Sequence, residues 1–79
     1  MAFYFFVWTP DIIEHLAEHD VTPDEFEEVV SNPEHEDVSR STGNLLAFGT
    51  GSTGRYLCCV FKRLEDDMIE PVTAYDVGE

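Results

Sequence analysis

The cations, histidines and tyrosines of this 79-residue chain are of the kinds that ribonucleases use. Cleavage of RNA by attack of its 2′-hydroxyl needs a base, an acid and cations around the phosphate. The residues that could supply these groups are Arg40, Arg55, Lys62, Arg63, His19, His35, Tyr56 and Tyr75. Arg55 and Arg63 have the same parity on one expected strand, so we expect them to point to the same face. The alternative is that the four cations only pair with the seventeen acids.

Two short motifs look like known signatures but lack the structural context that those signatures need. Residues 15–19 have the H-x-x-E-H spacing, which on a helix places two imidazoles on one face, as zinc requires. A catalytic zinc site needs a third ligand, so we interpret these residues as the polar end of a surface helix and predict no metal or other cofactor. Residues 49–55 contain G-x-x-x-x-G, but they precede a strand, whereas a phosphate-binding loop opens a helix. We interpret them as a hairpin loop.

The two cysteines, Cys58 and Cys59, are neighbours in an apolar stretch. Adjacent strand residues point to opposite faces, so these two are poorly placed to form a disulfide. A thiol in apolar surroundings stays protonated and unreactive, which indicates small core residues in a reducing compartment. The apolar residues 3–8 are too few to span a bilayer and lack the basic region and cleavage site of a signal peptide. These features predict a cytoplasmic protein without a membrane segment.

The charge of the chain is strongly negative and unevenly distributed. The net charge is −13, and residues 1–39 contain no Lys or Arg. Such a field repels nucleic acid and attracts a basic protein. We expect Glu25, Glu27 and Glu28 to point outward from the second helix, where they would contact a partner. The alternative is that the acids only keep the surface soluble.

The apolar pattern predicts a single α+β domain over residues 1–79, with the element order β-α-α-β-β-β-β. Each of two Thr-Pro pairs begins an amphipathic helix. The expected helices are 10–19 and 23–31, and the expected strands are 3–8, 36–40, 45–50, 55–64 and 68–77. Strand 55–64 is apolar on both faces and should be central in a mainly antiparallel, twisted sheet that carries the helices. Strand 3–8 is also apolar on both faces, which makes a homodimer plausible.

Two local features refine this arrangement. Thr22 and Glu25 have the spacing of a capping box, in which each side chain bonds the backbone N–H of the other. Pro71 lies within the last strand and predicts a bulge or an edge position there, because proline has no N–H to donate.

Several segments of the chain occur in an order that is typical of one toxin family. They are Phe6-Val7-Trp8, the connection between the two expected helices (18–26), Asn32-Pro33, Gly43, Gly49, the beginning of the expected strand 55–64 (54–60) and the terminal residues 72–75. In these segments the chain resembles the BrnT-type toxins of the RelE-like superfamily over most of its length. The resemblance implies a RelE-like fold, cleavage of RNA on or off the ribosome, and neutralisation by an antitoxin. It also implies a catalytic site at His19, Arg40 and Arg55, with Tyr75 where the family has arginine.

The chain departs from the family pattern in charge. Glu18 stands where the family has lysine, no basic helix follows the last strand before Glu79, and the family's positive charge is inverted. Two hypotheses therefore remain open. The first is a toxin component with ribonuclease activity, in which Lys62 and Arg63 also contact RNA. The second is a non-catalytic module with the same fold that binds an antitoxin or another basic protein.

Overall fold

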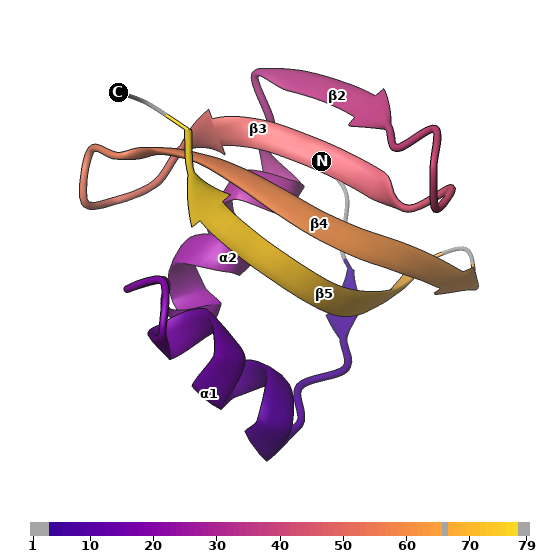
Figure 1. Ribbon diagram of the computed structural model, residues 1–79, viewed down its shortest axis with the longest axis horizontal. Helices are drawn as coiled ribbons and strands as arrows, with labels where there is room; N and C mark the ends of the chain where they lie inside the picture. Colours follow the sequence, from indigo (N-terminus) through magenta and orange to yellow (C-terminus); the bar gives the residue numbers. More distant parts are fainter. Residues whose placement is uncertain (1–3, 66, 78–79) are drawn as a thin grey trace.

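The computed structural model describes residues 4–65 and 67–77, which form two helices and a five-stranded sheet (Figure 1). The element order is β-α-α-β-β-β-β, as predicted. The elements in chain order are β1 (Phe5–Phe6), α1 (Pro10–Ala17), α2 (Pro23–Ser31), β2 (His35–Val38), β3 (Leu45–Thr50), β4 (Tyr56–Glu65) and β5 (Met68–Asp76). The predicted α+β class is confirmed.

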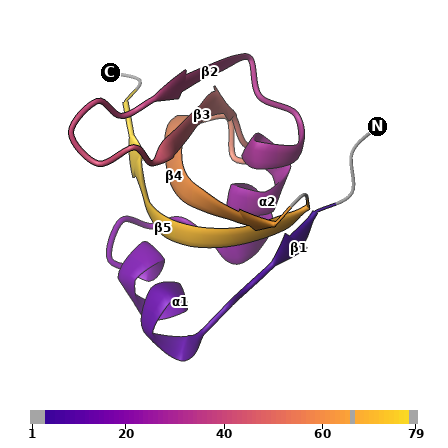
Figure 2. The same cartoon turned by 90° about the vertical axis from the view of Figure 1, so that its right-hand side faces the viewer.

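The sheet has the strand order β1-β5-β4-β3-β2, so β4 is central, as its two apolar faces predicted. β2, β3, β4 and β5 pair antiparallel in succession, and β1 pairs parallel to β5 through two residues. Figure 2 shows that the sheet is strongly curled and that α2 lies on its concave side. α2 packs on β3 and β4, whereas α1 packs on β5.

Both helices begin at the predicted threonines. The hydroxyl of Thr9 accepts a hydrogen bond from the N–H of Ile12 at 3.3 Å, and that of Thr22 accepts one from the N–H of Glu25 at 3.2 Å. α1 ends at Ala17, two residues earlier than expected. The following turn takes Asp20 to a φ of 60°, which a right-handed helix cannot contain. α2 ends at Ser31, where Asn32-Pro33 predicted it.

The core lies between α2 and the concave face of the sheet. Phe26 is fully buried and meets the ring of Trp8 edge to face, with 5.5 Å between the ring centroids. The buried cluster consists of Leu16, Val21, Phe26, Val29, Val30, Ala47, Leu57, Cys59, Phe61, Ile69 and Ala74. The connection before α1 and the inner faces of α2 and β4 therefore share one core.

Only β3 has its predicted bounds; β4 and β5 differ by no more than one residue at either end, and β1 and β2 differ by more. β1 is shorter than 3–8, and Phe3 lies outside the described residues. Phe5 is 70% exposed, because β1 pairs on one side only and its side chains alternate between core and solvent. β2 stops at Val38 because Ser39 bonds Asn44 and Gly43 in a turn. Arg40 is therefore in a turn and not in a strand.

The predicted irregularity at Pro71 is present. The register of β4 and β5 shifts between Val60 and Phe61, so that Phe61 faces Pro71 while Val60 faces Thr73. Val72 is the extra residue of this bulge. The bulge interrupts the hydrogen-bond ladder next to Pro71, which has no N–H to donate to it. Neither helix in the part of the chain that the structure describes is long and apolar enough to cross a bilayer.

Candidate functional site

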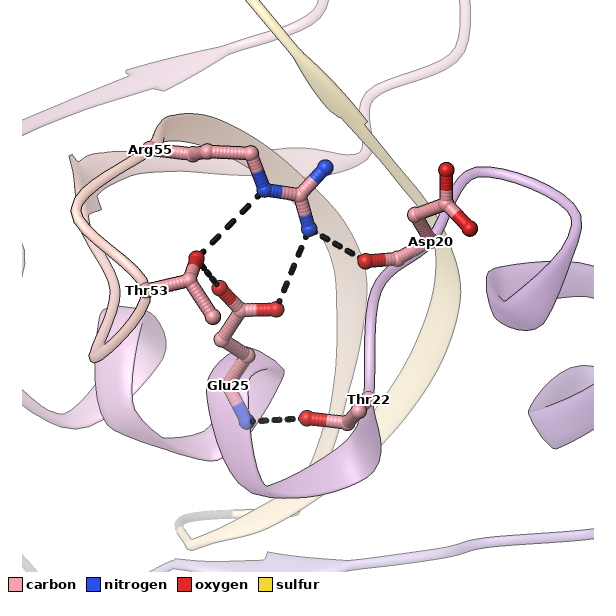
Figure 3. Close-up of polar contacts among 5 residues, drawn as sticks. All are labelled: Asp20, Thr22, Glu25, Thr53 and Arg55. Atoms are coloured by element: carbon pink, nitrogen blue, oxygen red, sulfur yellow. Dashed lines mark hydrogen bonds and ion pairs between the residues drawn. The ribbon is translucent and has the colours of Figure 1, made fainter.

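A buried carboxylate joins the loop between β3 and β4 to the joint between α1 and α2 (Figure 3). The Glu25 side chain is 1% exposed, and its Oε1 lies 3.3 Å from Arg55 Nη2 in an ion pair. Thr53 donates a hydrogen bond to the other oxygen of Glu25, and Arg55 Nη2 also donates to the carbonyl of Asp20. Together with Thr22, which caps α2, these residues form what we call the Glu25 network.

The local sequence explains why Glu25 points inward. Glu25 precedes Val29 by four positions, so it lies on the inner stripe of α2 beside Phe26. The expectation that Glu25 faces outward is therefore wrong. The capping box forms in one direction only, because the Glu25 carboxylate is directed to Thr53 and Arg55.

The loop that supplies Thr53 and Arg55 depends on two glycines. A Cβ on Gly51 would lie 2.8 Å from the Cγ of Glu25, so only glycine lets the loop pass this close. Gly54 has a φ of +87° and donates to the carbonyl of Gly51 in the turn. Residues 51–55 connect two antiparallel strands, so the predicted hairpin loop is confirmed for these residues, while Gly49 and Thr50 still belong to β3.

The network satisfies its own charges. Glu25 accepts from two side chains, and Arg55, which is 30% exposed, bonds a carboxylate, a carbonyl and the Thr53 hydroxyl. A carboxylate this deeply buried requires such partners, because an unpaired charge in the interior is costly. The arrangement is therefore a connection between two loops rather than an open set of groups directed at a ligand.

The structure does not bring the four predicted catalytic residues together. His19 is exposed and adjoins Asp20, to which Arg55 is bonded, so these two belong to one region. Arg40 follows Val38, which faces Leu45 at the opposite end of the sheet from the β3–β4 loop. Tyr75 faces Cys58 on the side of β4 that points away from the core cluster. The candidate site is thus divided among three places.

Arg55 directly precedes β4, whereas Arg63 lies near the other end of that strand. At a rise of about 3.3 Å per residue, eight positions correspond to roughly 26 Å. Arg63 Nη2 donates to the Tyr4 hydroxyl at 3.4 Å, and its guanidinium carbon lies 5.7 Å from the centroid of that ring. Lys62 and Arg40 are exposed at the same end of the sheet as Arg63.

A shallow cleft of about 270 Å³ opens at the Arg63 end. It is lined by Glu36, Asp37, Val38, Leu45, Leu46, Phe61 and Arg63. Two carboxylates beside one arginine give it no preference for phosphate, because the acids repel the anion that the arginine would attract.

The other two predicted partner contacts differ from each other. Glu27 is half-buried and accepts a hydrogen bond of 2.7 Å from Trp8 Nε1, so it also fixes the aromatic cluster. Glu28 is exposed, as expected. Of the three glutamates named from the sequence, Glu28 is therefore the one that is exposed.

The histidines of the H-x-x-E-H motif lie side by side, with 5.4 Å between the ring centroids of His15 and His19. His15 Nε2 lies 2.9 Å from Thr73 Oγ1, so this ring ties α1 to β5. Within residues 4–65 and 67–77 no group of three or more His, Cys, Asp or Glu side chains is placed to hold a metal ion.

The cysteines are free and buried on opposite sides of β4, as predicted. Burial raises the pKa of Cys59 to about 12, and the neighbouring Cys58 and Glu25 add to this. Burial also raises the pKa of Cys58, against the effect of its hydrogen bond with Tyr75, and that bond is the main reason why the pKa of Tyr75 is raised. Neither thiol is a nucleophile at neutral pH.

Sequence reasoning missed the roles of Thr53, Gly51 and the Asp20 carbonyl in the Glu25 network. The helical spacing from Glu25 to Val29 was the signal that could have placed the carboxylate inside. Comparisons with protein-family models, with curated proteins and with solved structures find no match for this chain.

Proposed function

We propose that this chain is a non-catalytic member of the BrnT-like group, with a RelE-like fold, that binds a basic segment of a protein partner. The observation that carries the proposal is the division of the predicted catalytic residues among three places, while the exposed acids of the helical region form no ion pair within residues 4–65 and 67–77. An RNA-cleaving site needs its cations and its acid–base groups around one phosphate.

The acids that we assign to partner binding are the exposed ones of the helical region. They are Asp11, Glu14, Glu18, Asp20, Asp24 and Glu28. No Lys or Arg occurs in residues 1–39 to neutralise them. Such a surface attracts a basic partner over long range and repels the RNA backbone, which supplies most of the affinity in nucleic-acid binding.

The identity of the partner follows from the same chemistry. The kinship proposed from the sequence makes an antitoxin with a basic segment the first candidate. The free thiols of Cys58 and Cys59 are compatible with the reducing cytoplasm, where we place the protein. A homodimer stays a prediction, and the 70% exposure of Phe5 on β1 is the feature that favours it.

Binding of a synthetic peptide tests the proposal. The peptide alternates lysine and arginine with leucine, and fluorescence anisotropy measures its affinity over a range of salt concentrations. The variant Asp24→Asn/Glu28→Gln removes two charges from α2, and Glu65→Gln/Asp67→Asn removes two from the β4–β5 hairpin. We expect the α2 variant to weaken binding by about threefold, as for two exposed ion pairs, and the hairpin variant to change it little. Equal losses would mean unspecific attraction by net charge and would contradict the proposal.

A ribonuclease is the second candidate, and one observation favours it. Arg55 is partly exposed and is bonded to the residue next to His19, so one cation and one imidazole share a region. The test incubates the protein with RNA, with and without ribosomes. Cleavage that His19→Ala abolishes, at an unchanged melting temperature, would establish this function. Intact RNA after incubation with the unmodified protein would exclude it.

A further inference from the structure

A second cleft, of about 260 Å³, lies between β5 and the segment that joins β1 to α1. Figure 2 shows this segment crossing from β1 to the start of α1 below β5. The cleft is lined by Val7, Thr9, Asp11, Ile12, Glu70 and Pro71. It belongs to none of the places that hold the predicted catalytic residues.

The cleft combines apolar walls with two carboxylates. Val7, Ile12 and Pro71 give it an apolar surface, and Val7 is 38% exposed. Asp11 and Glu70 are both exposed, and no Lys or Arg is among the lining residues. This is the chemistry that accepts a long cationic side chain, whose methylene stem packs on apolar surface while its charged end reaches the acids.

The two carboxylates have no side-chain partner within residues 4–65 and 67–77. Glu70 faces Lys62 in the register of β4 and β5, yet no ion pair joins them among these residues. The first turn of α1 is capped by Thr9, whose hydroxyl and carbonyl accept from the N–H groups of Ile12 and Ile13. The Asp11 carboxylate is therefore not used in capping and is available to a cation.

We propose that this cleft is the anchor for one lysine or arginine side chain of the basic partner. The inference rests on the proposed function and adds to it the point at which the partner is held most firmly. We take the basic partner as the occupant in preference to a second copy of this chain, because the chain has four Lys or Arg against seventeen Asp or Glu.

The test repeats the peptide titration with the variant Asp11→Asn/Glu70→Gln. We expect a loss of affinity of about tenfold, because both carboxylates that would bind the cation are neutralised. The control is Asp24→Asn/Glu28→Gln, which also removes two negative charges, but from α2 outside the cleft, and should lower the affinity about threefold. In a second series, each basic residue of the peptide is replaced in turn by norleucine, which keeps the stem and removes the charge. At one peptide position, the norleucine replacement should weaken binding to the unmodified protein but have little effect on binding to the Asp11→Asn/Glu70→Gln variant.

The outcomes separate the two proposals. A peptide that does not bind, or that binds independently of salt, contradicts the proposed function. If binding is salt-sensitive, but the two variants lose affinity equally and no peptide position is coupled to the cleft, the anchor proposal is overturned and the proposed function stands. Asp11 also lies in the first turn of α1, so thermal unfolding is measured for each variant. If Asp11→Asn unfolds the protein, Glu70→Gln alone must show the coupling to one peptide position, and its absence overturns the anchor.

Discussion

Replacing Glu25 by alanine removes the buried half of the ion pair that joins the β3–β4 loop to the helices. Arg55 then loses its carboxylate partner, and Thr53 loses the acceptor of its hydroxyl. The substitution also leaves a void beside Gly51, whose backbone packs closely on the Glu25 side chain. All three effects act against the folded state.

The expected loss follows from the burial of the two partners. Breaking a fully buried pair by removing one partner costs about 3–5 kcal/mol. The carboxylate is 1% exposed, but the Arg55 side chain is 30% exposed and can be solvated after the change. We therefore expect a smaller loss than for a fully buried pair, about 2–3 kcal/mol in the free energy of unfolding. For a domain of this size that corresponds to a melting temperature lower by about 10–20 °C.

Urea and thermal unfolding, followed by circular dichroism, measure the effect. The matched control is Glu28→Ala, which changes an exposed glutamate on the same helix and should alter the stability by no more than about 0.5 kcal/mol. Equal melting temperatures for the two variants would refute the reasoning. The ion pair would then contribute nothing to folding, and Arg55 would be free to serve a ligand.

Three further changes test other parts of the structure. Gly51→Ala places a Cβ against the buried carboxylate and should cost about 1–3 kcal/mol, more than the roughly 1 kcal/mol expected for Gly43→Ala, whose positive φ is strained but whose surroundings are open. Trp8→Phe removes the hydrogen bond to Glu27 and should lower the unfolding free energy by about 1 kcal/mol in urea titrations. Burial raises the pKa of Cys59 from 9.0 in the unfolded chain to about 12, so the folded state holds its proton more tightly. That contribution to stability is complete below pH 9 and is lost between pH 9 and 12. Urea unfolding at increasing pH measures this loss, and the unfolding free energy of Cys59→Ala should fall less steeply over the same range.

The elements of the fold were predictable because their signals are local. Thr-Pro pairs fix the two helix starts, and the two apolar faces of residues 55–64 require a central strand. The bounds of β2 could not be read in the same way. The turn that removes Arg40 from the strand is held by backbone hydrogen bonds between Ser39 and residues Gly43 and Asn44, and the residue types do not indicate where these bonds begin.

The site was less predictable, because its residues meet through the tertiary structure. Arg55 and Glu25 are thirty positions apart, and nothing in their own segments indicates that they pair. The parity of Arg55 and Arg63 gave no information about the length of strand between them, and Arg55 lies in the loop before β4. Arg40, His19 and Tyr75 were grouped by residue type, whereas the register places them at different ends and faces of the sheet.

The position of Arg55 weighs most in the choice between the two functions. Arg55 can offer a phosphate only the N–H groups that Glu25, Asp20 and Thr53 leave unused, because an unpaired Glu25 carboxylate in the interior is costly. The other three cations, Arg40, Lys62 and Arg63, are not bound in this way, but they lie at the end of the sheet away from His19. A phosphate bound at that end would meet these three cations but no imidazole. A phosphate bound between α1 and α2 would meet the imidazole of His19, but there Arg55 is already in an ion pair with Glu25. Binding of a cation in the cleft at Asp11 and Glu70 breaks no existing ion pair, because these two carboxylates form none within residues 4–65 and 67–77.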